Sequence, residues 1–256
     1  METIRVERNS GVVTVTLDRP EVLNAATATT WDEITQVCAE VARDDSDRVM
    51  ILTGAGRAFC SGADLSGFEG TDDPVLTSMR RASAAARALV RLPKPTIAKV
   101  NGVAAGAGAN LALACDLVVA SVDASFCEIF ARRGLSVDFA GSWLLPRLVG
   151  LHRAKELVLL ADMVPAEDAL AMGLVNRVVP AGELDTFVEG WARRLASGPP
   201  LALSLSKMLL EDGVDSGLDA ALEAEGAAQC YNFSTSDIKE AIAAWREKRE
   251  PRFRGR

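Results

Sequence analysis

Two glycine-rich segments carry residues small enough for a ligand to reach the main chain. Residues 54–59 (GAGRAF) and residues 102–110 (GVAAGAGAN) each follow a predicted strand. Where a loop enters a helix, small side chains leave backbone N–H groups open, and two such groups directed at one point polarise a carbonyl oxygen. The segments therefore predict an oxyanion hole. The alternative, which composition alone would favour, is that glycine and alanine serve only close packing.

Neither segment fits a nucleotide-binding motif. A dinucleotide fingerprint needs a third small residue for close packing of helix on strand, and Phe59 and Leu111 stand at those places. No lysine follows in the pattern of a phosphate-binding loop. We therefore expect no nicotinamide, flavin or other cofactor.

Strands and helices must alternate to position these segments. Alternating apolar residues or short apolar runs predict strands, and apolar residues at three- and four-residue spacing predict helices. The predicted strands are 11–17, 48–53, 96–100, 117–120 and 174–179, and the predicted helices among them are 27–41, 76–92, 141–148 and 153–160. This order is typical of an α/β fold.

The last part of the chain is predicted to be helical throughout. Helices are expected at 183–195, 199–210, 218–229 and 236–249. The sharpest break is the sequence GPP at 198–200. We therefore expect a core at 1–195 and a separate helical part at 196–256.

The composition excludes several other classes of protein. There are 28 basic and 35 acidic side chains, with a net charge of -7, so nucleic acid and anionic membranes are unsuitable partners. The five cysteines form no Cys-x-x-Cys pair, which argues against a zinc site or a disulfide framework. No signal peptide or membrane-spanning run is evident. We expect a cytoplasmic protein without a metal, in which carboxylates and the main chain carry any catalysis.

Four motifs give a more specific indication. They are LDRPEVLNA at 17–25, GRAFCSGADL at 56–65, KPTIAKVNGVAAGAG at 94–108 and ALAMGLVN at 169–176. Together they resemble the crotonase (enoyl-CoA hydratase/isomerase) superfamily from residue 17 to the C-terminus. The resemblance implies a crotonase-like spiral of ββα turns that binds and converts an acyl-CoA thioester, with coenzyme A as part of the substrate. It also implies a C-terminal helical domain that builds homotrimers or homohexamers.

The resemblance assigns the oxyanion hole to the amides of Ala63 and Ala107. A thioester enolate carries its charge on the former carbonyl oxygen, which two fixed N–H donors stabilise. Ala107 and Gly108 would open a helix, whose dipole adds to this stabilisation. Asp64 is expected to orient the loop beside Ala63 through hydrogen bonds rather than to react.

The chain departs from the family at two acids. Hydratases of this family resemble one another in using two glutamates, and the matching positions here hold Asn110 and Phe130. Water addition needs a base and a matched acid, and neither of these side chains exchanges protons. Asn110 is expected to orient a substrate group or a water through its amide. The two replacements argue against ordinary hydration.

Asp138 stands at another position that the family uses for an acid. It matches the acid of dienoyl-CoA isomerases and of the ring-epoxide isomerases of phenylacetate breakdown. The chain resembles the latter group most, through VAAGAGA at 103–109 and WLLPR at 143–147. One carboxyl beside an oxyanion hole suffices to move a proton within an allylic system. Apolar neighbours would raise its pKa by desolvation if they surround it.

Two alternatives to this assignment stay open. Asp138 precedes a predicted helix and could serve as its N-cap, a contact that typically contributes about 1 kcal/mol. Glu128 is a second candidate acid. If residues 128–130 were helical, its side chain would point about 200° away from position 130, which favours Asp138.

The resemblance also implies contacts with the substrate. Family members offer a terminal phenylalanine and a basic residue to the adenine and phosphate of CoA, and Phe253 and Arg254 match those places. Arg57, Leu65 and Gly108 are further candidates on the CoA side. Candidates for the acyl group are Phe68, Met79, Phe130 and Phe139.

Three functions follow from these expectations. The first is an enoyl-CoA double-bond isomerase or ring-epoxide isomerase that uses Asp138. The second is an enoyl-CoA hydratase in which Glu128 or another carboxylate replaces the missing pair. The third is a non-catalytic paralogue that binds acyl-CoA.

Overall fold

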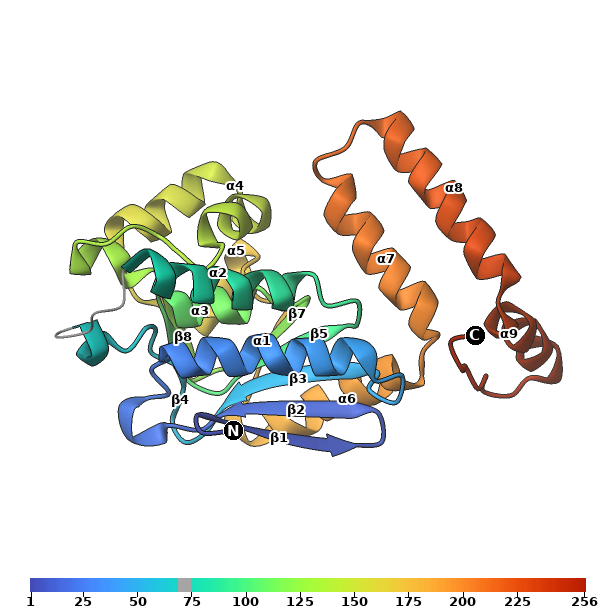
Figure 1. Cartoon of the computed structure of the whole chain (residues 1–256), viewed down its shortest axis with the longest axis horizontal. Coiled ribbons are helices and arrows are strands. Elements are labelled where there is room, and N and C mark those ends of the chain that lie inside the picture. The colour runs from blue at the N-terminus through green and yellow to red at the C-terminus, as the bar shows by residue number, and fades with distance from the viewer. Residues whose placement is uncertain (69–74) are drawn as a thin grey trace.

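The computed structural model describes residues 1–68 and 75–256, and its larger sheet has six strands (Figure 1). Their order is β1-β2-β3-β5-β7-β10, in which β1 and β2 are antiparallel and the other pairs are parallel. The strands are β1 (Ile4–Asn9), β2 (Val12–Leu17), β3 (Val49–Gly54), β5 (Thr96–Val100), β7 (Leu117–Ser121) and β10 (Arg177–Val179). The central strands β3 and β5 are buried almost throughout, as expected for a sheet covered on both faces.

A smaller sheet continues three of these strands. It consists of β4 (Ala58–Cys60), β6 (Val103–Ala105), β8 (Ser125–Cys127) and β9 (Val164–Pro165), in that order. The short strands β4, β6 and β8 follow β3, β5 and β7 along the chain, and the pairs β4–β6 and β6–β8 are parallel. Each turn of the chain therefore adds one strand to each sheet, which produces the expected spiral.

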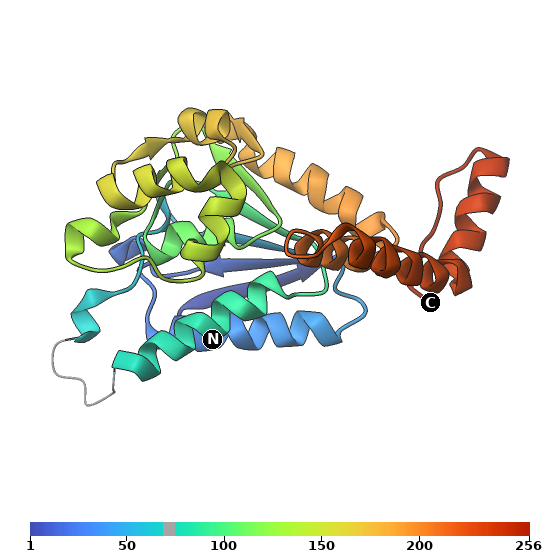
Figure 2. The same ribbon diagram turned by 90° about the horizontal axis from the view of Figure 1, so that it is seen from above.

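Helices cover both faces of the larger sheet (Figure 2). On one side, α1 (Ala28–Arg43) packs along α2 (Val75–Val90), and α3 (Ala107–Leu113) is completely buried. On the other side, α6 (Leu184–Ser197) packs on β3, β5 and β7. The remaining core helices are α4 (Gly141–Leu160) and α5 (Ala166–Met172), and the short 3-10 helices are η1 (Pro20–Val22), η2 (Leu65–Phe68), η3 (Ile129–Arg133) and η4 (Ala181–Glu183).

The last three helices extend away from the sheets in both views (Figures 1 and 2). They are α7 (Pro200–Gly213), α8 (Leu218–Ser234) and α9 (Ser236–Glu247). These helices carry several large apolar side chains that are exposed in the single chain, among them Leu210, Leu218, Phe233 and Trp245. In the described part of the chain, no helix is both long and apolar enough to cross a membrane.

The predicted elements agree with the structure where the apolar pattern is long. The two helices expected at 141–148 and 153–160 form α4, which Gly150 interrupts with a φ of 77°. The strand predicted at 174–179 is shorter, because only Arg177–Val179 pair with β7. The strand β1 was not predicted, because Ile4 and Val6 are its only apolar residues and two apolar residues are too few to indicate a strand.

Candidate active site

A cavity of about 480 Å³ opens between the start of α1, the start of α2 and the segment that follows β4. Ala63 and Asp138, two residues predicted to act on a substrate, both line it. Trp31, Met79 and Ala82 contribute apolar surface to the same wall. The cavity therefore brings together Ala63, a candidate amide donor, Asp138 and apolar surface, whereas Ala107 is not among its lining residues.

The segments that contain Ala63 and Ala107 lie side by side. Each follows a glycine with positive φ, Gly62 at 104° and Gly106 at 52°, a conformation that other residues rarely adopt. A Cβ atom on Gly62 would lie 3.9 Å from the amide nitrogen of Ala107. Ala107 begins α3, and the first N–H groups of a helix have no acceptor within it. Within the described residues, neither the Ala63 nor the Ala107 N–H bonds to a main-chain acceptor of another element.

Asp138 lies in a turn between η3 and α4. Its main-chain carbonyl accepts hydrogen bonds from the Gly141 N–H at 2.9 Å and from Asn110 Nδ2 at 3.0 Å. Phe139 and Ala140, which follow it, have left-handed φ angles of 46° and 61°. Because such angles cost about 1–2 kcal/mol per residue for L-amino acids, the surrounding contacts must hold this turn. Asp138 itself lines the cavity.

The carboxyl of Asp138 does not cap the next helix. The N-cap residue of α4 is Ala140, and no side chain bonds to the first turn. The interpretation of Asp138 as an N-cap is therefore wrong. Its Oδ1 is buried without a hydrogen-bond partner among the described residues, so this carboxyl is not committed to a structural contact there.

Glu128 is joined to Asp138 by Asn110. Glu128 is 4% exposed, and its Oε2 accepts a hydrogen bond from Asn110 Nδ2 at 3.3 Å. The helical argument against Glu128 is wrong, because this residue follows β8 and precedes η3. The helical period therefore does not give its direction.

Burial raises the pKa of the Glu128 and Asp138 carboxyls toward neutral pH. It raises the pKa of Asp138 to about 6. The pKa of Glu128 is raised to about 7, chiefly by burial and further by the charge of Asp138, while the hydrogen bond from Asn110 opposes the rise. A carboxyl with a pKa near the working pH is suited to both accepting and returning a proton.

Asp64, which also lines the cavity, is held by other groups. It accepts hydrogen bonds from the Ser66 N–H at 3.1 Å, the Ser66 hydroxyl at 2.6 Å and Arg19 Nη1 at 2.9 Å. The bonds from Ser66 and Arg19 lower the pKa of Asp64. The carboxylate therefore fastens the loop, in keeping with its expected orienting role.

The candidate acyl-group residues lie at different depths. Met79 lines the cavity directly. Phe139 is buried and packs on Trp31, with ring centroids 4.9 Å apart, and Phe130 is buried away from the cavity wall. The side chain of Phe68 lies outside the described part of the chain.

The three candidates for the CoA side do not line the cavity, although Leu65 lies between two residues that do, Asp64 and Ser66. Arg57 and Leu65 are exposed. Gly108 instead faces the protein, since a Cβ atom there would lie 2.3 Å from the main-chain oxygen of Cys60. Of these three candidates, Arg57 and Leu65 have side chains that a ligand can reach in the single chain.

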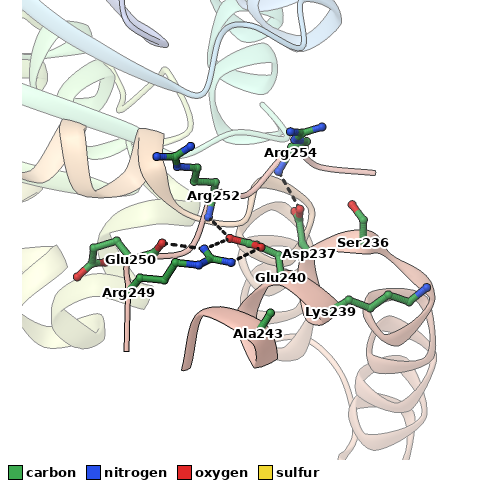
Figure 3. Close-up of a pocket in the computed structure, with 9 residues that line it drawn as sticks. All are labelled: Ser236, Asp237, Lys239, Glu240, Ala243, Arg249, Glu250, Arg252 and Arg254. Carbon is green, nitrogen blue, oxygen red and sulfur yellow. Dashed lines mark hydrogen bonds and ion pairs between the residues drawn. The ribbon is translucent and has the colours of Figure 1, made fainter. Parts of the chain in front are cut away.

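The C-terminal candidates lie at the other end of the molecule. Figures 1 and 2 place the tail beside α9, at the opposite end of the molecule from the starts of α1 and α2, which line the cavity. The Arg254 N–H donates to Asp237 at 2.8 Å, and the carbonyl of Phe253 accepts from Arg48 at 3.2 Å. The tail forms a separate hollow of about 860 Å³ with α9, in which Arg249 pairs with Glu240 (Figure 3). A single chain therefore does not bring Phe253 and Arg254 to the cavity.

Sequence reasoning missed most of the cavity wall, including Arg19 and the residues at the start of α1. Arg19 lies in the LDRP motif, but the motif does not indicate what this residue does. Trp31 belongs to the apolar face of α1, and nothing in the sequence distinguishes it from an ordinary core residue.

Comparisons with known proteins agree with this architecture. The family model described as enoyl-CoA hydratase/isomerase matches residues 7–256. A probable enoyl-CoA hydratase of Rhodobacter capsulatus is 41% identical over 99% of this chain and 98% of its own length. The 1,2-epoxyphenylacetyl-CoA isomerase of Escherichia coli is 38% identical over the full length of both chains.

A solved structure gives the same result. The crystal structure of an enoyl-CoA hydratase from Bacillus anthracis superimposes with a TM-score of 0.96, at 32% identity and with complete coverage of both chains. The ββα spiral, the paired glycine-rich segments and these matches lead to one conclusion. The chain belongs to the enoyl-CoA hydratase/isomerase family of enzymes.

Proposed function

We propose that this enzyme is an enoyl-CoA isomerase that uses Asp138 as its acid and base. The observation that carries the proposal is the presence of Asp138 and Ala63 in the wall of one cavity. A carboxyl and an N–H donor at one site are the two groups that enolate chemistry needs.

The reaction follows from these two groups. The Asp138 carboxylate takes a proton from C2 of a 3-enoyl-CoA, and the electron pair spreads over the thioester as a dienolate. The amides of Ala63 and Ala107 stabilise the charge on the thioester oxygen. The carboxyl then returns the proton to C4, which gives the conjugated 2-enoyl-CoA. One acid suffices because the same carboxyl takes the proton from C2 and delivers a proton to C4, and while protonated it can exchange with solvent.

Opening of a ring epoxide is the related reaction within this proposal. It would use the same enolate-stabilising amides and the same proton carrier. The likeness to the Escherichia coli protein named 1,2-epoxyphenylacetyl-CoA isomerase supports this version.

Hydration of an enoyl-CoA is the second candidate. It is favoured by Glu128, a second carboxyl that Asn110 joins to Asp138. The relative in Rhodobacter capsulatus is also named as a hydratase. Hydration would require Glu128 to act on a water, although Glu128 is buried and does not line the cavity.

The third candidate function is that of a non-catalytic paralogue that only binds acyl-CoA.

The deciding experiment follows a 3-enoyl-CoA in deuterated buffer. We expect the natural chain to exchange its α-proton and to conjugate the double bond. Asp138→Asn should lower both rates at least 100-fold, because an amide cannot accept the proton. Glu156→Gln, an exposed carboxyl on α4, is the matched control and should behave as the natural chain.

Each other outcome contradicts the proposal. Full activity of Asp138→Asn would show that another group transfers the proton, and Glu128 is the next candidate. Rapid water addition to a 2-enoyl-CoA, without isomerisation, would favour the hydratase. A chain that binds acyl-CoA but exchanges no proton would favour the non-catalytic paralogue.

We also propose that the chain assembles as a homotrimer or homohexamer. The helices α7–α9 extend from the sheets and expose large apolar side chains, which a second copy could cover. Phe253 and Arg254 would then contact the CoA bound to a neighbouring copy, since their own cavity is distant.

A further inference from the structure

Glu128 is a buried carboxyl that proton transfer by Asp138 does not use. Its Oε2 accepts from Asn110 Nδ2 at 3.3 Å, and the same nitrogen donates to the Asp138 carbonyl at 3.0 Å. Asn110 is fully buried. One amide group therefore connects Glu128 to the residue that lines the cavity.

This cluster of Glu128, Asn110 and Asp138 contains more acceptors than donors. Asn110 Oδ1 and Asp138 Oδ1 are both buried and have no hydrogen-bond partner among the described residues. Among the described residues, the charge that acts on Glu128 is that of Asp138, and no cation offsets it there. A buried, unpaired carboxylate is unfavourable, whereas a protonated carboxyl removes one charge and supplies a donor. The cluster therefore favours one bound proton.

The groups around Glu128 indicate which carboxyl holds that proton. Asn110 faces it from α3 and Asp138 from the turn before α4, while the neighbouring Cys127 thiol has a pKa raised by burial and stays neutral. The pKa of Glu128, about 7, lies above that of Asp138, about 6. Glu128 is buried and does not line the cavity, whereas Asp138 is only partly buried and lines it, so burial disfavours the charge of Glu128 more. We therefore expect Glu128 to keep its proton while Asp138 acts as a base.

We propose that Glu128 is a positioning residue that works in its protonated form, accepting from Asn110 so that Asn110 anchors the main chain of Asp138. This inference rests on the proposed proton transfer by Asp138. Without the anchor, the strained turn at Phe139 and Ala140 can relax and carry the Asp138 carboxyl out of the cavity wall. Ionisation of Glu128 would leave its hydrogen bond from Asn110 in place but would add a second negative charge next to Asp138, which opposes formation of the enolate. Activity should therefore fall as Glu128 ionises.

The test compares pH profiles of kcat/KM for isomerisation of a 3-enoyl-CoA. In the natural chain, the rate should rise near pH 6 as Asp138 ionises and fall near pH 7 as Glu128 ionises. Glu128→Gln keeps a donor and an acceptor but cannot ionise, so its rate should rise at the same pH and then stay level. A purely structural role for Glu128 would not remove the falling limb.

A second variant measures the anchoring itself. Glu128→Leu can neither accept from Asn110 nor donate to it, and should lower kcat at least tenfold while KM changes less than threefold. Glu156→Gln is the control and should reproduce the pH profile of the natural chain. All variants are measured with the same substrate, so any titration of the substrate affects every profile equally. Circular dichroism and sedimentation show whether each variant folds. If Glu128→Leu does not fold, Glu128→Gln alone decides.

Two results would overturn the inference: a falling limb in Glu128→Gln like that of the natural chain, or a natural kcat in folded Glu128→Leu. Asp138→Asn separates this failure from a failure of the proposed function. If Asp138→Asn is inactive and both Glu128 variants behave as the natural chain, only the role of Glu128 is wrong. If Asp138→Asn is fully active, or the natural chain is inert, both proposals are wrong.

Discussion

Gly141 leaves the space that the Asn110 amide occupies. A Cβ atom at position 141 would lie 2.4 Å from Asn110 Nδ2 and 2.6 Å from Val137 Cγ2. Gly141→Ala should therefore displace Asn110 and lower the free energy of unfolding by about 1–3 kcal/mol, a typical cost of overpacking. Urea denaturation measures this change, and kcat should fall with it.

Gly190→Ala is the control for that substitution. A Cβ atom on Gly190 meets no atom within 4 Å, and the residue lies inside α6. Alanine should stabilise this helix by about 0.5–1 kcal/mol relative to glycine. Equal stability of Gly141→Ala and the natural chain would show that Asn110 has room to move.

Burial of Glu128 also makes stability depend on pH. Its pKa is raised from 4.5 in the unfolded chain to about 7 in the fold, so the folded state binds more protons between these values. The free energy of unfolding should therefore fall as pH rises from about 4.5 to 7, by up to about 3 kcal/mol from this group. Glu128→Gln should lack this fall in denaturation series at pH 5 and pH 8, whereas Glu156→Gln should retain it. Parallel curves for the natural chain and Glu128→Gln would show that the shift is absent.

At the scale of elements, a capping box starts α1 beside the cavity. The Thr30 N–H donates to Thr27 Oγ1 at 3.3 Å, and the Thr27 N–H donates to Thr30 Oγ1 at 3.0 Å. Thr27→Ala should lower the free energy of unfolding by about 1 kcal/mol. Thr29→Ala, in the first turn of the same helix, should change the free energy of unfolding by only a few tenths of the effect of Thr27→Ala. An equal loss of stability in both variants would contradict the capping role. Chemical denaturation distinguishes the two.

Long apolar patterns predicted most of the fold. The strands β2, β3, β5 and β7 and the helices α1 and α2 lie within two residues of their predicted bounds. The strands β4, β6 and β8 have three residues each and depend on pairing with one another, so no local pattern announces them. The direction of Glu128 was predicted wrongly for the same reason, because it follows one of these short strands. Contacts between distant segments decide its place.

At the scale of the whole molecule, α7–α9 have too few contacts of their own to bury their apolar side chains. Leu210 is 75% exposed, Leu218 74% and Trp245 80%. The pattern of helix-forming residues predicted these helices. It did not predict what covers them, because an apolar helix face has the same sequence pattern whether it packs on its own core or on a second copy of the chain.

Association should therefore depend on these side chains. The double variant Leu210→Glu with Leu218→Glu should sediment as a monomer at concentrations where the natural chain sediments as a trimer or hexamer. Glu223→Gln, an exposed change on α8, should leave the association unchanged. A natural chain that sediments as a monomer would contradict the proposed assembly.

The two halves of the site differ in what encodes them. The proposed oxyanion hole consists of main-chain amides set by the spiral and by two glycines, whereas the acid half consists of the side chains of Glu128, Asn110 and Asp138. A point mutation can replace any of these side chains, but it leaves the N–H of Ala63 and Ala107 in place. Evolution can therefore exchange one acyl-CoA reaction for another through single codon changes while enolate stabilisation is inherited with the backbone. Relatives named as hydratases and as an isomerase, each about 40% identical to this chain, are what such a division of the site would produce.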